Sequence, residues 1–316
     1  MKKINKKISY LRSNGFVNAG QIVFTQNEID ELLNICTNIF NKFDSDYKKG
    51  IKHEDFMVVN NIPLGFTRVP EHSERLSELI NNLLNNKNIT TILENILGKD
   101  YKIWQIVYRR SNVGDKGLSI HQDAYGETNM SILLSDNETY SGSTVFVPKS
   151  HLVKKNLKSL GIQIPSFLMR VFAFMLKPLS GKSGDIGFFF NYTWHGRYPN
   201  NNKVNNAILF SFFPATSSIG YDHKDYPKWS NNFLNKNNRL ANLVDSKIGI
   251  KKRDDNRYEV LKKNINDDVP FVLKLQDPKI KLRKNYSSII YYYIFILTIL
   301  FKILIYVRNF FKLFKL

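Results

Sequence analysis

The pattern of apolar positions divides the chain into a helical N-terminal part and a strand-rich middle part. Thr25 and Glu28 fit a capping box, and apolar residues recur after them at helical spacing, so we expect a helix to begin there. A second helix is predicted over residues 74–97, with Gly98 closing it. Just before the first helix, the apolar residues 21–24 predict a short strand.

After Asp100 the hydrophobic period changes to that of strands. The predicted strands cover residues 101–108, 130–134, 143–147, 186–190 and 207–212, with turn-forming residues between them. Helices followed by many short strands indicate an α+β protein with a β-sandwich or an open barrel at its centre. An apolar segment at residues 157–179 interrupts the strands, and we interpret it as a helix or a lid.

The last 41 residues differ from the rest. Residues 276–316 hold eight Lys/Arg and one Asp, a formal charge of +7, and residues 287–301 contain no charge. A spanning helix needs about 20 apolar residues, and this segment reaches that length only by including Lys302. We expect a membrane anchor or an interfacial helix. The alternative is a final helix that packs on the domain or mediates oligomerisation.

This reading predicts a folded domain at residues 1–275, placed in the cytoplasm, and a membrane-associating helix at residues 276–316. The basic N-terminus is followed by no apolar run of the length that a secretory signal requires. The single cysteine, Cys36, excludes a disulfide framework within the chain and indicates a reducing compartment. Because Cys36 lies in an apolar run, we expect a buried structural thiol.

The chain of 316 residues is 43% hydrophobic, with 16 Tyr and 23 Phe, as expected of a packed globular protein. Its formal net charge of +19 has two explanations: a nucleic-acid or membrane partner, or a general drift toward Lys, Asn and Ile. The lysines are scattered and no nucleic-acid-binding motif is present. We therefore favour drift for the body and a membrane surface for the tail, with no nucleic-acid partner.

Three residues carry the candidate chemistry. His121 and Asp123 are separated by one residue, and alternate residues of a strand share a face, so both can contact one ion while Gln122 points away. His195 ends a second apolar strand. Two histidines and one carboxylate form a facial triad that binds Fe(II) and leaves positions open for a co-substrate and O2. With neutral imidazoles the loaded site carries a net +1, which suits an anionic co-substrate.

At this point the sequence resembles the phytanoyl-CoA dioxygenase family of Fe(II)/2-oxoglutarate oxygenases, over roughly residues 14–214. His121-Gln122-Asp123 matches the proximal motif of that family. Further blocks resemble its opening strand and first helix, its Gly-x-x-x-Phe-Val-Pro-Gly-Ser-His segment and its distal block; they are residues 14–17, 25–33, 142–151, 184–189 and 194–200.

The resemblance implies a double-stranded β-helix, iron held by His121, Asp123 and His195, 2-oxoglutarate as co-substrate, and hydroxylation of an unidentified small molecule by O2. The membrane-associating tail, and not the resemblance, suggests a lipid, an acyl thioester or a glycan precursor as substrate. His151 and Asp185 then have structural roles in turns. Lys149 replaces the usual glycine of its segment, which predicts a different turn there.

One departure concerns the co-substrate. The family usually places an arginine 10–12 residues after the distal histidine, where a guanidinium pairs with the far carboxylate of 2-oxoglutarate. Residues 204–207 contain no arginine. Lys203 is the first residue that we consider as its replacement, and Arg197 is the second. Arg109 and Arg110 are the other nearby cations in the sequence. Gln105, on the strand before the proximal motif, is a further candidate for contact with the co-substrate.

The missing arginine keeps two other hypotheses open. One is a non-catalytic protein of this fold that binds a ligand or partner at a membrane. The other is a metal enzyme of the same fold that does not use 2-oxoglutarate. His53, His72 and His223 are expected to have no role in metal binding.

Overall fold

The computed structural model describes residues 2–123, 126–152, 169, 173–214, 229–236, 238–244 and 271–274. The predicted lid at residues 157–179 lies mostly outside this part, and the predicted C-terminal helix at residues 276–316 lies wholly outside it. Within the described residues, no helix has both the length and the apolar character needed to cross a bilayer.

The helices are mostly N-terminal. Along the chain they are α1 (Lys2–Asn14), α2 (Gln26–Lys48), η1 (Val69–His72), α3 (Glu74–Asn85), α4 (Lys87–Leu97), η2 (Ser150–Leu152), α6 (Asn231–Lys236), α7 (Asn238–Leu243) and α8 (Phe271–Lys274). The strands are β1 (Phe16–Gly20), β2 (Phe56–Val59), β3 (Ile62–Phe66), β4 (Tyr101–Ser111), β5 (Leu118–His121), β6 (Thr128–Leu133), β7 (Thr144–Phe146), β8 (Lys177–Pro178), β9 (Ile186–Phe190), β10 (His195–Arg197) and β11 (Asn205–Pro214).

The strands form two antiparallel sheets. The larger has the order β1-β9-β6-β11-β4-β3-β2, and the smaller has the order β5-β10-β7-β8. From β4 to β11 the chain crosses repeatedly from one sheet to the other, so neighbouring strands within a sheet are distant in sequence. This is the double-stranded β-helix, or jelly roll. The expected α+β class with an antiparallel β-core is confirmed.

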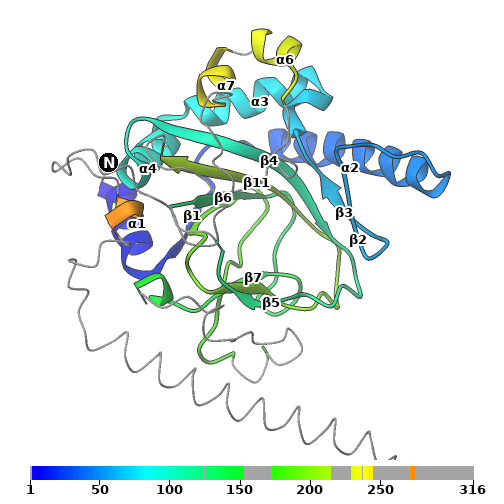
Figure 1. Cartoon of the computed structure of the whole chain (residues 1–316). Coiled ribbons are helices and arrows are strands. Elements are labelled where there is room, and N and C mark those ends of the chain that lie inside the picture. The colour runs from blue at the N-terminus through cyan, green and yellow to red at the C-terminus, as the bar shows by residue number, and fades with distance from the viewer. Residues whose placement is uncertain are drawn as a thin grey trace, which may run out of the picture.

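The helices cover the outer face of the larger sheet, and the smaller sheet lies against its inner face (Figure 1). Alternate residues of the central strands point outward into one apolar core shared with α2, α3 and α4; on the strands they include Ile106, Tyr108, Met130, Ile132, Phe188, Phe190, Ile208 and Phe210. Cys36 of α2 is buried there as a free thiol, as predicted. On the central strands, the residues that alternate with these core residues face the smaller sheet, where the candidate site lies.

The helix predicted over residues 74–97 is two helices. Asn86 ends α3 and also begins α4, where its side-chain oxygen accepts a hydrogen bond of 2.9 Å from the backbone amide of Asn88. The prediction missed this break because the apolar spacing continues through it: Leu83, Leu84 and Ile89 are all buried. Gly98 closes α4 with a φ of 84°, as expected.

Near the N-terminus one predicted strand was misplaced and one helix was not predicted. The strand lies at Phe16–Gly20 rather than at residues 21–24, because Gly20 with a φ of 83° turns the chain out of the sheet. Ahead of it, α1 was not predicted. Its apolar residues Ile4, Ile8 and Leu11 follow helical spacing and are buried, but all of the other positions except Tyr10 are charged or polar, four of them lysines.

The turn at Lys149 also differs from expectation. Lys149 has a φ of 65°, the left-handed conformation that glycine adopts readily, and its amide donates a 3.0 Å hydrogen bond to the carbonyl of Asn14. The lysine therefore takes a glycine-type backbone conformation, and the change in residue type does not bring a different turn.

The shared cap at Asn86 leads to a stability prediction. Asn86→Ala should lower the free energy of unfolding by about 1 kcal/mol, because the N-terminus of α4 loses its side-chain acceptor. Denaturant unfolding followed by circular dichroism measures the change. Asn85→Ala is the matched control: Asn85 is exposed, so its replacement should leave stability nearly unchanged. Equal effects of the two variants would contradict the capping role.

Candidate metal centre

The smaller sheet brings the two histidines together. His195 begins β10, His121 ends β5, and the two residues are directly paired in the antiparallel register. On its other side His195 pairs with Phe146 of β7. Asp123 lies two residues beyond the end of β5, and its amide donates a 3.1 Å hydrogen bond to the carbonyl of Asn191. Two histidines that are 74 positions apart in the sequence thus share one site through strand pairing.

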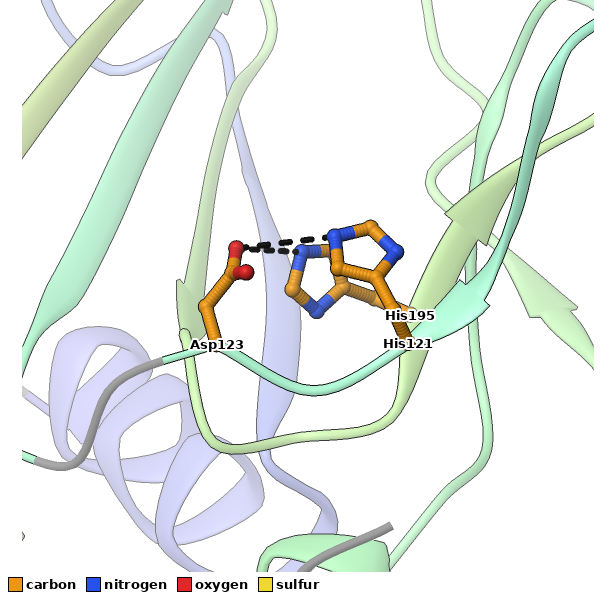
Figure 2. A group of neighbouring side chains, drawn as sticks. All are labelled: His121, Asp123 and His195. Atoms are coloured by element: carbon orange, nitrogen blue, oxygen red, sulfur yellow. Dashed lines mark ion pairs between the residues drawn. The ribbon is translucent and has the colours of Figure 1, made fainter. Parts of the chain in front are cut away.

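All three side chains converge on one point (Figure 2). The Oδ2 atom of Asp123 lies 3.5 Å from Nε2 of His121 and 3.4 Å from Nε2 of His195. The two imidazole rings are 4.4 Å apart between centroids and tilted by 50°. For metal–ligand bonds of about 2.1 Å, adjacent donors lie about 3 Å apart, so a small inward movement of these donors accommodates one ion.

Each histidine is oriented by the backbone two residues before it. Nδ1 of His121 lies 2.8 Å from the carbonyl oxygen of Ser119, and Nδ1 of His195 lies 2.7 Å from that of Thr193. A carbonyl oxygen can only accept, so each Nδ1 carries the proton and donates it. Each Nε2 then keeps a lone pair directed at the shared point, which is the arrangement that metal-binding histidines require.

The Asp123 carboxylate is held in its charged form. Burial on its own would raise the pKa of Asp123. When both imidazoles also carry a proton on Nε2, their hydrogen bonds and charges outweigh burial and hold the pKa of Asp123 below its ordinary value. A bound ion would take the place of those two protons. A charged carboxylate beside two imidazole lone pairs is a donor set for a divalent first-row metal with open coordination positions. The residues present therefore fit the iron that the sequence predicts.

A buried carboxylate that the sequence did not single out supports this arrangement. Glu127 accepts hydrogen bonds from the indole of Trp104 and the side-chain amide of Asn191, and its carbonyl accepts the Asn191 amide at 3.0 Å. Asn191 in turn fixes the backbone of Asp123. Glu127 gives no sequence signal beyond being an acid near the proximal motif, because its role depends on contacts with residues far along the chain.

The three residues considered as contacts for the co-substrate lie in three different parts of the structure. Gln105 lies on β4 and donates a 3.1 Å hydrogen bond to Ser211 of β11. Arg197 lies on β10, two residues after His195, with Nη2 3.5 Å from Asp115. Lys203 lies at the surface, 45% exposed, with Nζ 3.9 Å from Glu138.

Residues expected to be structural have structural contacts. Gln122 points away from the metal ligands and donates to the carbonyl of Tyr192 at 2.9 Å. His151 is buried, which lowers its pKa to about 4, and its Nε2 lies 3.0 Å from the carbonyl of Arg12. Asp185 accepts from Asn18 at 3.0 Å in the turn before β9. His53 and His72 contact Asp46 and Thr67, away from the triad, and His223 lies outside the described residues.

Comparison with known proteins agrees with the site. A family model, phytanoyl-CoA dioxygenase, matches residues 11–204, which include all three triad residues. No curated protein sequence matches the chain significantly.

Solved structures share the fold at low sequence identity. EvdMO1 has a TM-score of 0.52 and 21% identity, covering 67% of this chain and 50% of its own. AviO1 from Streptomyces viridochromogenes Tue57 has a TM-score of 0.52 and 17% identity, covering 72% and 97%. The epimerase SnoN, solved with Fe3+, alpha ketoglutarate and nogalamycin RO, has a TM-score of 0.53 and 15% identity, covering 71% and 88%. These similarities establish the jelly-roll fold.

The geometry predicts that His121, Asp123 and His195 act together in metal binding. Replacing any one by alanine should weaken anaerobic Fe(II) binding by more than about 100-fold, since loss of an outer-shell partner alone costs 10- to 100-fold. Mn(II) binding followed by electron paramagnetic resonance provides a second measurement. His53→Ala is the control, because His53 contacts Asp46 away from the triad. A triad variant with unchanged metal affinity would contradict the assignment.

Proposed function

The chain belongs to the phytanoyl-CoA dioxygenase family, and on that basis we propose that it is an Fe(II)- and 2-oxoglutarate-dependent dioxygenase that hydroxylates a small-molecule substrate with O2. The observation that carries the proposal is the convergence of His121, Asp123 and His195, whose ligand atoms all lie within 4.8 Å of one another. A lipid or glycan-type substrate would suit an enzyme held near a membrane.

In this proposal the three side chains hold iron on one face and leave the opposite face to the co-substrate and O2. Bound iron and 2-oxoglutarate supply the oxidising power for breaking a C–H bond. The protein fixes the ligand geometry before the ion arrives, through the carbonyls of Ser119 and Thr193. The rings of Phe146 and Phe189 lie beside His195, with centroids 6.2 Å and 5.5 Å away, and exclude water from that side.

The alternatives are less well supported. A non-catalytic binding protein would have no need for two imidazoles with matched tautomers and a charged carboxylate at one point. A metal enzyme that does not use 2-oxoglutarate would keep the triad but would not need a cation for the far carboxylate of that acid. Fe(II) binding and succinate formation separate the three hypotheses.

The proposal predicts that protein with Fe(II) and 2-oxoglutarate shows a weak visible charge-transfer band under anaerobic conditions, and that in air it forms succinate while consuming O2. Without its preferred substrate this turnover should be slow. His121→Ala should abolish both signals, and His53→Ala should keep them. Fe(II) binding without succinate would favour a different metal chemistry, and absence of both would favour a non-catalytic protein.

We also propose that residues 276–316 bring the domain to an anionic membrane surface. The support is their charge of +7, the uncharged segment at residues 287–301, and aromatic residues near both ends of that segment. The tail would then hold the site near an apolar substrate.

The full chain should therefore sediment with phosphatidylserine-containing vesicles and much less with phosphatidylcholine vesicles. Replacing Ile294 and Ile296 together by Asp should weaken this binding by at least about 10-fold, because charged groups oppose burial in the interface. Val113→Asp, at an exposed position of the domain, is the control. Vesicle binding that survives the double replacement would show that the tail is not the contact.

A further inference from the structure

Arg109 of β4 faces the same interior as the triad. Its two neighbours on the strand point the other way, toward the helices. Arg110 packs over the ring of Phe40 of α2, and Tyr108 belongs to the helix-covered core. Side chains alternate along a strand. Arg110 therefore points toward the helices, and Arg109 points toward the smaller sheet, where Arg197 is the charged group that acts on it.

Arg109 has no hydrogen-bond acceptor or carboxylate partner among the described residues. Burial and the nearby Arg197 charge lower its pKa to about 10, so the guanidinium stays protonated at neutral pH. Asp115 lies 3.5 Å from Arg197 and accounts for one of the two positive charges. Among the described residues, one positive charge therefore has no counter-ion in a part-buried site, an arrangement that costs free energy unless an anion binds there.

The strands leave room around this guanidinium. The two residues paired with Arg109 are Ala207 on β11 and Gly65 on β3. A Cβ on Gly65 would lie 1.8 Å from the carbonyl oxygen of Tyr108, so no larger residue fits there. Arg109 is thus flanked on both sides by the two smallest residue types.

Ala207 also marks the place where the family arginine is missing. It stands 12 residues after His195, at the start of the strand that usually carries that arginine. Directly paired residues of antiparallel strands have Cβ atoms about 5 Å apart. A guanidinium from Arg109 can therefore occupy the space that an arginine at position 207 would fill.

The position relative to the triad fits a short dicarboxylate. Arg197 follows His195 by two residues on β10, so it points into the same interior about 6.6 Å further along the strand. Arg109 lies close enough to Arg197 for their charges to interact. A five-carbon acid that chelates a metal at the triad can extend along β10 and place its other carboxylate beside these two guanidiniums.

Resting on the proposed function, we propose that Arg109, with Arg197 beside it, binds the far carboxylate of 2-oxoglutarate from β4, in place of the arginine that the family usually carries on β11. The anchoring guanidinium would then come from the strand next to β11 in the larger sheet, and the carboxylate that it binds would occupy the same place as in the family. Lys203, the first choice on sequence grounds, lies at the surface beside Glu138.

The test compares two acids that differ only at the far end, 2-oxoglutarate and 2-oxovalerate, bound anaerobically to the full chain loaded with Fe(II). Wild-type protein should bind 2-oxoglutarate far more tightly. Arg109→Gln should weaken 2-oxoglutarate binding by about 10- to 100-fold, the effect of losing hydrogen bonds to a charged group, and leave 2-oxovalerate binding nearly unchanged. The affinity of Arg109→Lys for 2-oxoglutarate should lie between those of the wild type and Arg109→Gln, because lysine keeps the charge and loses the bidentate contact.

A second readout separates this role from a structural one. Because Arg109 faces a like charge, Arg109→Gln should not lower the melting temperature of the protein without ligands, but it should remove the rise that 2-oxoglutarate causes in the metal-loaded protein. Arg110→Gln, on the opposite face of the same strand, is the matched control and should keep full discrimination between the two acids.

Four results would overturn the inference. Discrimination that survives both Arg109 variants shows that the anchor lies elsewhere, and loss of discrimination in Lys203→Gln with Arg109→Gln unaffected assigns it to the loop. An Arg109→Gln protein that is less stable without ligands and weakens both acids equally shows a structural role. Wild-type protein that binds Fe(II) but neither acid overturns the proposed function and this inference together, a pattern distinct from the other results.

Discussion

The antiparallel register that sets His195 against His121 is the constraint on which the site depends. β10 lies between β5 and β7, so its position is fixed from both sides. A shift of one residue would turn the imidazole of His195 to the other face of the sheet. The larger sheet and its helices support this register indirectly, because the short strands of the smaller sheet pack against the larger sheet.

The interior of the barrel has an uneven distribution of charge. The triad contributes one carboxylate. Further along the same interior are the guanidiniums of Arg109 and Arg197, and among the described residues only Arg197 has a carboxylate partner, Asp115. An ion and a dicarboxylate bound together would balance both regions. The architecture therefore favours binding of the two components as a pair over binding of either alone.

Much of this arrangement could be predicted from local sequence patterns. The strand at residues 186–190, the capping box at Thr25 and the buried Cys36 follow from spacing and residue type alone. What could not be predicted depends on pairing between distant residues: the role of Glu127, and the placement of Arg109 against Ala207, since a strand shows which face a residue takes but not which strand lies beside it. The β2–β3 hairpin was missed although Asn60 and Asn61, both with positive φ, form its turn.

The backbone carbonyls behind the two histidines have a consequence for the choice of metal. They set both imidazoles before any ion arrives, so capture requires little rearrangement and the donors present a nearly fixed triangle of two nitrogens and one oxygen. Such a set binds divalent first-row ions in the Irving–Williams order, in which iron stands below cobalt, nickel and copper. The resident ion is then determined by which metals the cell keeps available, and a protein produced where nickel is abundant would carry nickel.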